Sequence, residues 1–311
     1  MTWEGMLDVT GTFQKSDQDA FSSYHPIILF LYFCVVLFFS MFFMHPFILI
    51  ISLVSMFVYS VVLNGWKAVK FNVFYLLPIT IIVALINPLF NHSGVTILFY
   101  MNNNPITLES IVYGIILGIV FISVIIGFSC FNKIMTSDKL MYLFGRFIPI
   151  LSLMFSMTLR FVPRYKAQIK KISNAQKCIG MDASCGNILH RVKNGVRIIS
   201  ILITWALENA IESADSMKAR GFGLKGRTSF SIFAWKKGDK TLIVIQLIML
   251  AVILVGLSLG KFEAAYIPII RISGIEENAV VFYLAYALFC LLPTIVDGKE
   301  SLVWNNLKSA N

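Results

Sequence analysis

The sequence has few charged residues. Only 14% of its 311 residues are Asp, Glu, Lys or Arg, whereas 58% are hydrophobic, and the mean hydropathy is +0.79. Soluble domains carry about 25% charged residues, so a water-soluble globular fold is excluded as the main organisation of the chain. The composition instead indicates that most of the chain lies in a lipid bilayer.

The sequence also lacks the local patterns that mark common catalytic and nucleotide-binding sites. It has no GxxxxGK[ST] phosphate loop, no HExxH metal motif, no nucleophile elbow between a strand and a helix, and no dinucleotide fingerprint after a strand. We therefore expect a chain that is not an enzyme, with no catalytic residues, no bound cofactor and no ATPase site of its own.

Cysteine is sparse and scattered. The five cysteines form no disulfide framework and no zinc-binding spacing. Cys178, Cys185 and His190 are the one group that could hold a metal ion, but their separation fits no common zinc pattern. Reduced thiols on a cytoplasmic surface are the simpler interpretation, so no metal site is predicted.

Six apolar segments have the length of membrane spans. A helix needs about 20 residues to cross a hydrocarbon core of about 30 Å. Because the segments are continuously apolar rather than alternating, they favour helices over the strands of a barrel. We predict an all-α, polytopic membrane protein with about six transmembrane helices. The predicted spans are 27–44, 47–63, 71–90, 106–131, 241–259 and 279–296.

Positive charge is concentrated between the fourth and fifth spans. Residues 132–240 hold 19 of the 26 Lys and Arg residues but only 6 of the 16 acids, a net charge of +13. Because positively charged loops face the cytoplasm, this segment is predicted to be cytoplasmic. Counting spans in both directions from this segment then places both termini in the cytoplasm. It also places loop 91–105 outside the cell, and this loop has no Lys or Arg.

The predicted chain therefore has five parts in a multi-pass protein of the cell membrane. Four spans and a polar tail precede the basic cytoplasmic domain, and two spans and a second tail follow it. The parts are 1–23 (N-terminal tail), 24–131 (spans one to four), 132–240 (basic coupling domain), 241–297 (spans five and six) and 298–311 (C-terminal tail).

The basic domain is predicted to contain amphipathic helices. Residues 147–163 are apolar but interrupted by Arg160, which is typical of an interfacial helix, and the strongly basic residues 164–177 follow as a helix. In residues 194–219, polar side chains recur every three or four positions. We expect the apolar face of that helix, which includes Ile199, Ile203 and Ile211, to be packed and the polar face to be free. A basic domain attracted to anionic lipid headgroups would have the same composition.

Two GxxxG patterns occur within predicted spans, at 114–118 and 256–260. Glycines at this spacing allow two membrane helices to approach closely. We favour packing inside the chain over dimerisation, because such patterns are frequent in apolar segments.

The most informative local pattern is Met217-Lys-Ala-Arg-Gly-Phe-Gly223, at the end of the second amphipathic helix. Gly221 can adopt the left-handed conformation that caps a helix. Arg220 would then stand at the helix end, where its guanidinium can form bidentate bonds to carboxylates of a partner. A basic residue at this place also simply complements the helix dipole.

Four segments together resemble the transmembrane T component of energy-coupling factor (ECF) transporters, the EcfT/CbiQ family. The resemblance covers roughly residues 24–297, in the order of the family. The matching segments are Asn87–Phe90, Ser156–Pro163, Ala175–Asp182 and Ala214–Gly223.

The resemblance implies a scaffold that couples partner ATPases to the uptake of a vitamin or a metal ion. Two coupling helices of such a scaffold each end in a short arginine motif, and the motifs dock on two ABC-type ATPase subunits. A separate membrane S component captures the micronutrient and determines which compound is carried.

The resemblance assigns the coupling motifs unequally. The second motif maps onto Ala219, Arg220 and Gly221, which fit the family pattern. The first maps onto Cys178-Ile179-Gly180, where Ile179 stands in the place of the usual arginine. This departure implies either an apolar contact with the ATPase at the first site or a divergent ATPase partner.

Two other classes of function remain open from the sequence. An integral membrane enzyme acting on lipid would need a cluster of acids, bases or metal ligands at the interface. A self-sufficient channel or receptor would need a polar span or a ligand pocket. Copurification of ATPase subunits would separate the coupling scaffold from both.

The charge asymmetry generates a prediction about topology. A cysteine introduced at Asn102 is expected to react with an impermeant thiol reagent on intact cells. A cysteine at Lys193 is expected to react only after permeabilisation, because it lies in the +13 segment. The reverse labelling pattern would show that the predicted orientation is wrong.

Overall fold

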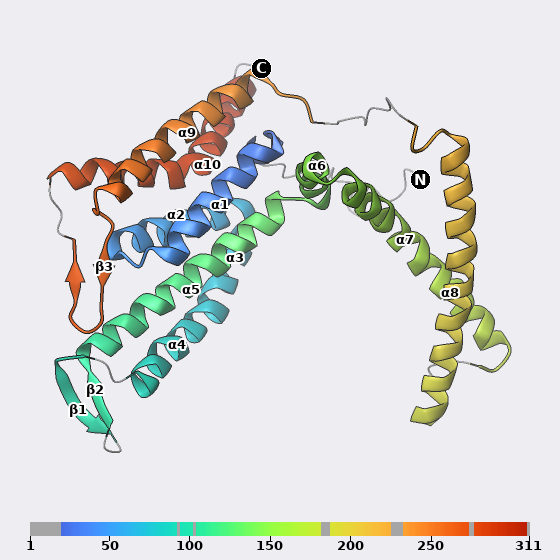
Figure 1. Ribbon diagram of the computed structural model, residues 1–311, viewed down its shortest axis with the longest axis horizontal. Coiled ribbons are helices and arrows are strands. Elements are labelled where there is room, and N and C mark those ends of the chain that lie inside the picture. Colours follow the sequence, from blue (N-terminus) through green and yellow to red (C-terminus); the bar gives the residue numbers. More distant parts are fainter. Residues whose placement is uncertain are drawn as a thin grey trace. The chain divides into compact units, whose positions relative to one another are not determined.

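The apolar spans predicted from the sequence are helices in the structure. This computed structural model (Figure 1) describes residues 20–91, 94–101, 104–181, 187–224, 233–273 and 277–309. Five helical runs are long and apolar enough to cross a bilayer, and a sixth apolar helix has 17 residues, close to the lower limit for a span. The predicted all-α, polytopic membrane fold is confirmed.

Each predicted span corresponds to one helical run, with ends shifted by a few residues except at the end of the last span. The first three are α1 (Pro26–Phe42), α2 (Pro46–Asn64) and the π-helical turn η3 (Asn72–Leu76) continued by α4 (Leu77–Phe90). The others are α5 (Leu108–Ile134), α9 (Lys237–Ser258) and α10 (Glu277–Ser309). Helix α10 extends through most of the segment predicted as a C-terminal tail.

Short elements connect the spans. The helical turn η2 (Ala20–Ser23) precedes α1, and α3 (Trp66–Phe71) follows α2. Antiparallel strands β1 (Ile97–Met101) and β2 (Asn104–Thr107) form a hairpin between α4 and α5, and β3 (Ala264–Ala265) pairs with β4 (Arg271–Ile272) between α9 and α10.

The chain divides into two units. The membrane unit comprises the described parts of Met1–Thr136 and Phe233–Asn311, and the inserted unit comprises those of Ser137–Ile232. The inserted unit consists of α6 (Ser137–Phe147), α7 (Pro149–Cys178) and α8 (Ile188–Ala219). It lies within the range 132–240 predicted for the basic domain.

Close glycine contacts hold α5 against α4. A Cβ atom added to Gly114 would lie 2.5 Å from the backbone oxygen of Ala84, and one added to Gly118 would lie 2.7 Å from the Thr80 side chain. Both contacts require the absence of a side chain on α5. The first GxxxG pattern therefore packs inside the chain, as predicted.

The second GxxxG pattern also serves packing within the membrane unit. A Cβ atom at Gly256 would lie 2.7 Å from the ring of Phe282 on α10. The letters at 256–260 also match GxSxG, but Ser258 is the last residue of α9, and its hydroxyl donates to the Val255 backbone oxygen at 2.8 Å. This serine is therefore at a helix end and not at a nucleophile elbow.

Polar contacts inside the membrane unit involve the backbone of α10. The backbone oxygen of Cys290 accepts hydrogen bonds from the hydroxyls of Tyr32 on α1, at 2.7 Å, and Ser55 on α2, at 2.6 Å. Pro293 lies inside α10 and lacks a backbone N–H. These two hydroxyls thus tie α1 and α2 to the backbone of α10, about one turn before its proline.

A buried carboxylate joins the chain returning from the inserted unit to the first span. Asp239, 3% exposed, accepts from the backbone N–H of His25 at 3.2 Å and of Lys236 at 2.8 Å. The His25 ring stacks on Trp235 with centroids 4.1 Å apart. The starts of α1 and α9 are therefore fastened together.

Gly114→Ala is expected to destabilise the membrane unit by about 1–3 kcal/mol, because the new methyl group meets backbone and not a flexible side chain. Gly298→Ala, on α10 with no atom within 4 Å, serves as the control and should be neutral or slightly stabilising. The measurement is the temperature at which buried Cys130 and Cys290 become reactive in detergent. Equal midpoints for the two variants would contradict the close α4–α5 contact.

Candidate functional site

Helices α7 and α8 end in the same local structure. After α7, the N–H of Gly180 donates to the Lys177 oxygen at 3.0 Å, and that of Met181 donates to the Gln176 oxygen at 2.9 Å. Gly180 has φ +75°. This pair of bonds around a left-handed glycine is a Schellman motif, which gives donors to carbonyl groups that the helix leaves without partners.

The end of α8 repeats this arrangement. The N–H of Gly221 donates to the Lys218 oxygen at 2.9 Å, and that of Phe222 donates to the Met217 oxygen at 3.0 Å. Gly221 has φ +77°, so the left-handed cap predicted for this glycine is confirmed. We call residues 178–181 the first tip and residues 219–222 the second tip.

The two tips place Ile179 and Arg220 in equivalent positions. Each is the C-cap residue, directly before the left-handed glycine. Both are exposed, Ile179 to 61%. Met181 and Phe222 also correspond, as the residues after the glycine. The sequence reasoning did not single out these two, although a helix end with glycine commonly carries an apolar residue at this place.

The tip geometry by itself does not identify a binding site. Helix α9 ends in the same way, since Gly260 has φ +69° and the N–H of Lys261 donates to the Gly256 oxygen at 3.2 Å. That helix end belongs to the membrane unit. Any special role of the first and second tips must therefore come from their side chains and from the helices that carry them.

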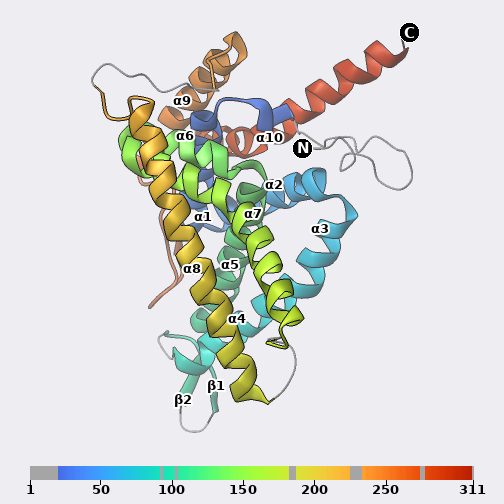
Figure 2. The ribbon, with the colours of Figure 1, turned by 90° about the vertical axis from the view of Figure 1, so that its right-hand side faces the viewer.

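A contact cluster at the middle of both helices holds α7 and α8 together. The Arg164 guanidinium donates to the Asn209 side-chain oxygen at 2.8 Å and lies 5.3 Å from the centre of the Trp205 ring. Tyr165 packs edge-on against the same ring, with centroids 5.8 Å apart. Figure 2 shows α7 and α8 running side by side. An arginine over an aromatic face gives a directional contact that lysine does not reproduce.

The structure corrects the prediction for the faces of α8. The apolar side chains Ile199, Ile203 and Ile211, expected to lie on a packed face, are exposed to 56%, 53% and 66%. The buried positions are Asn194 and Ile198 instead. Helix α7 contacts α8 along a narrow strip only. The apolar face of α8 is therefore not packed against any described part of the inserted unit.

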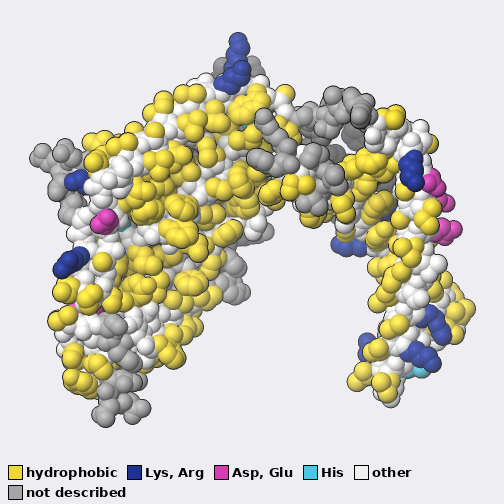
Figure 3. Space-filling model, in the orientation of Figure 1, with side chains coloured by type: hydrophobic (Ala, Val, Ile, Leu, Met, Phe, Trp, Pro, Cys, Tyr) yellow, Lys and Arg dark blue, Asp and Glu magenta, His cyan; other side chains and the backbone are white. Residues whose placement is uncertain are grey.

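The acidic side chains of α8 lie in one half of its length. Figure 3 shows acidic side chains toward only one end of the helix, whereas Lys and Arg side chains lie toward both ends. The basic N-terminal half contains Arg191, Lys193 and Arg197, and the C-terminal half contains Glu208, Glu212 and Asp215. The last of these lies 3.9 Å from Lys218 in an exposed pair, which contributes little to stability.

Helix α7 is one continuous helix where the sequence suggested two segments. It runs from Pro149 to Cys178 and contains Pro163 in its interior. The apparent boundary at 163 came from the change from apolar to basic side chains, which marks a change of surroundings and not a helix end. The preceding helix α6 was not predicted, and the Ser152 hydroxyl joins α7 to it by donating to the Met141 oxygen at 3.0 Å.

The weak metal pattern finds no support in the described residues. His190 lies 3.2 Å from the side-chain nitrogen of Asn194, measured from its Nδ1 atom, and Cys178 is an exposed thiol. Cys185 lies outside the described residues. Within residues 20–91, 94–101, 104–181, 187–224, 233–273 and 277–309, no group of three metal-ligating side chains occurs.

The fold and the paired tips define a polytopic membrane protein with a helical unit inserted between its fourth and fifth spans. The CbiQ family, whose description is cobalt transport protein, matches residues 24–230 of this chain. The match covers more than half of the chain and includes both tips. The chain belongs to the CbiQ family.

Named relatives extend this assignment. The transmembrane protein EcfT 1 of the energy-coupling factor transporter from Listeria monocytogenes is 31% identical over 172 residues, which are 51% of this chain and 64% of that protein. The EcfT protein from Leuconostoc gelidum is 30% identical over 186 residues, 56% of this chain and 68% of the relative. The one from Lactococcus lactis is 35% identical over 106 residues, 34% and 40% of the two chains.

The chain thus spans from about two fifths to two thirds of the length of these relatives. All three are named as transmembrane proteins of transporters and not as enzymes. The resemblance to the EcfT/CbiQ family inferred from sequence is confirmed, and the alternative interpretation as a lipid-acting enzyme gains no support.

The contact cluster generates a prediction about the inserted unit. Arg164→Ala removes the hydrogen bond to Asn209 and the contact with Trp205, and should loosen the helix pair by about 1–2 kcal/mol. Hydrogen exchange in residues 200–210 would rise accordingly. The control is Arg160→Ala, which removes an exposed arginine one helical turn earlier. Unchanged exchange in the Arg164 variant would show that this cluster does not hold the pair.

Proposed function

We propose that this chain is the T component of an ECF-type importer and couples ATP hydrolysis by two ABC-type ATPase subunits to uptake through a membrane S component. The observation that supports this most directly is the pair of equivalent, exposed helix tips on one helix pair within a family of transporter proteins. A chain without a phosphate loop receives the free energy of ATP only through contacts with partners, and the tips are suited to such contacts.

The helix pair can be described as a lever that turns about the contact cluster and has two arms of equal length. One arm runs from Arg164 to Cys178 and the other from Trp205 to Ala219. Each arm spans 14 residues, or about 21 Å at 1.5 Å per residue. The two helices pack antiparallel, with contacts between Arg164 and Asn209 and between Met181 and Arg197, so the tips lie on opposite sides of the contact cluster. When two ATPases close on ATP, tips seated in them would shift relative to one another, and the cluster would convert that shift into a rotation of the helices.

The exposed apolar face of α8 supports a second partner. Ile199, Ile203 and Ile211 lie at helical spacing, and an uncovered apolar face of this kind is suited to the apolar surface of an S component or to the bilayer. We infer that this face follows the rotation of the helix pair and passes it to the S component. A vitamin or a metal ion is the proposed class of cargo, and the family description favours cobalt.

The proposed orientation follows the positive charge. The inserted unit and both termini would face the cytoplasm of a cell membrane, where the ATPases are found. This orientation also leaves the β1–β2 hairpin outside, in a loop without Lys or Arg.

Substitutions at the tips test the coupling role in the complete transporter. Arg220→Ala removes up to five donors and leaves partner carboxylates without a cation, at a cost of about 2–5 kcal/mol when the contact is buried. Assembly with the ATPase subunits and ATP-driven uptake should both fall sharply. Lys218→Ala, which removes a charge from the same helical turn, should have little effect because its ion pair is exposed.

The first tip should respond differently. Ile179→Ala removes only apolar contact, about 1–2 kcal/mol if the side chain is covered by the partner, and Ile179→Asp should be worse because it buries an unpaired charge. Pull-down of the ATPase subunits and an uptake assay measure both effects. If the Arg220→Ala protein assembles and transports normally, the proposed coupling role is wrong.

A further inference from the structure

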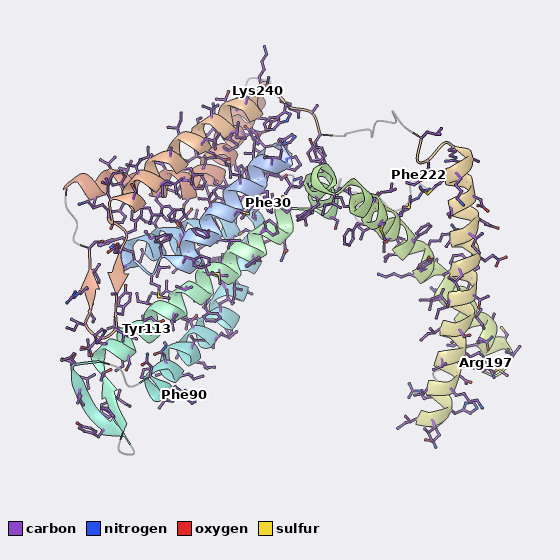
Figure 4. The ribbon with its side chains drawn as sticks, viewed as in Figure 1. Phe30, Phe90, Tyr113, Arg197, Phe222 and Lys240 are labelled. Atoms are coloured by element: carbon purple, nitrogen blue, oxygen red, sulfur yellow. The ribbon has the colours of Figure 1, made fainter. Side chains whose placement is uncertain are left out.

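Arg197 of α8 contacts the first tip. Its Nη1 atom contacts the sulfur of Met181, the residue after Gly180. Figure 4 shows Arg197 and Phe222 toward opposite ends of α8, Phe222 at the second tip and Arg197 beside the first. A guanidinium therefore lies beside both tips, although the sequence places an arginine in only one of them.

The first tip has no cation at its C-cap position. Ile179 occupies the C-cap position and is 61% exposed, where the second tip has Arg220. Lys177 is two residues earlier, and side chains two positions apart on a helix point in different directions. Its ammonium is therefore poorly placed to take the position of a C-cap guanidinium.

Arg197 has the capacity to bind a partner. Its side chain is exposed, and among the described residues it contacts an uncharged thioether. A thioether is a weak acceptor, and a guanidinium carries five N–H donors. Among the described residues only the thioether contacts these donors, so the others can bind a carboxylate that approaches the tip.

We propose that Arg197 supplies the guanidinium of the first tip, so that this tip binds an acidic side chain of an ATPase subunit through Arg197 and an apolar surface through Ile179. This inference rests on the proposed coupling function. It makes the first tip a composite of two helices, whereas the second tip carries its arginine on its own C-cap.

The test is a rescue experiment in the complete complex of T component, S component and ATPase subunits. Arg197→Ala should lower recovery of the ATPase subunits and uptake by about tenfold or more, as expected for the loss of a charge-assisted contact. Ile179→Arg added to Arg197→Ala should restore both, because it puts a guanidinium back at the same tip. Lys193→Ala, one helical turn earlier on the same exposed side, is the control and should behave like the unmodified chain.

Two results would overturn the proposal. Normal assembly and uptake with Arg197→Ala would show that Arg197 is not part of the site. Impaired function that Ile179→Arg does not rescue would assign Arg197 a structural role, which hydrogen exchange of α8 in the same variant would reveal as a loss of protection.

Further variants separate this proposal from its alternatives. Asp182 lies next to Met181 in the sequence and outside the described residues, so an internal pair with Arg197 is the competing explanation. Asp182→Asn should then reproduce the defect of Arg197→Ala, and that outcome would overturn the proposal. Arg220→Ala tests the coupling function independently. If Arg220→Ala fails to assemble while Arg197→Ala assembles normally, only the composite tip is wrong.

Discussion

A hydrocarbon core offers no hydrogen-bond partner to a peptide backbone, and the membrane unit is built around that constraint. Its spans are helices because a helix satisfies its own backbone groups. Helices that share a surface must then pack without help from the hydrophobic effect, since lipid is as apolar as their side chains. Contact at Gly114 and Gly118 on α5, and at Gly256 on α9, supplies close packing instead. The hydroxyls of Tyr32 and Ser55 add polar contacts beside Pro293.

The inserted unit follows different physics. Helices α7 and α8 are long, touch along a limited line and leave large apolar side chains exposed. Few buried contacts hold such a pair, so the directional contact of Arg164 with Trp205 and Asn209 carries much of its geometry. A pair that touches over a limited surface can change its angle while each helix remains stiff. That property suits a coupling element better than a rigidly packed core would.

The sequence predicts best where one physical requirement acts on a continuous segment. The six spans follow from apolar length, and the cap at Gly221 follows from a glycine at the end of a periodic pattern. The continuity of α7 through Pro163 was missed because the change in side-chain polarity resembled a boundary. The exposed apolar face of α8 was also missed, since amphipathic periodicity shows that a helix has an apolar face but not whether this chain covers it.

Arg197 was missed for a further reason. Its contact with Met181 joins residues 16 positions apart across two helices, and neither periodicity nor a local motif signals such a contact. The equivalence of Ile179 and Arg220, in contrast, could be read from the glycine that follows each of them. Sequence thus located both tips but assigned a cation to only one.

The two tips differ in how their charge depends on the helix pair. The Arg220 guanidinium is attached to the cap of α8 itself, so it stays with the second tip at any angle between the helices. The Arg197 guanidinium reaches the first tip only while α8 lies beside the end of α7. A rotation about the Arg164 cluster would therefore alter the cation at the first tip and leave the second unchanged. Under the proposed function, the departure at Ile179 would link the strength of one ATPase contact to the angle between the helices, which a pair of arginines on the two caps would not do.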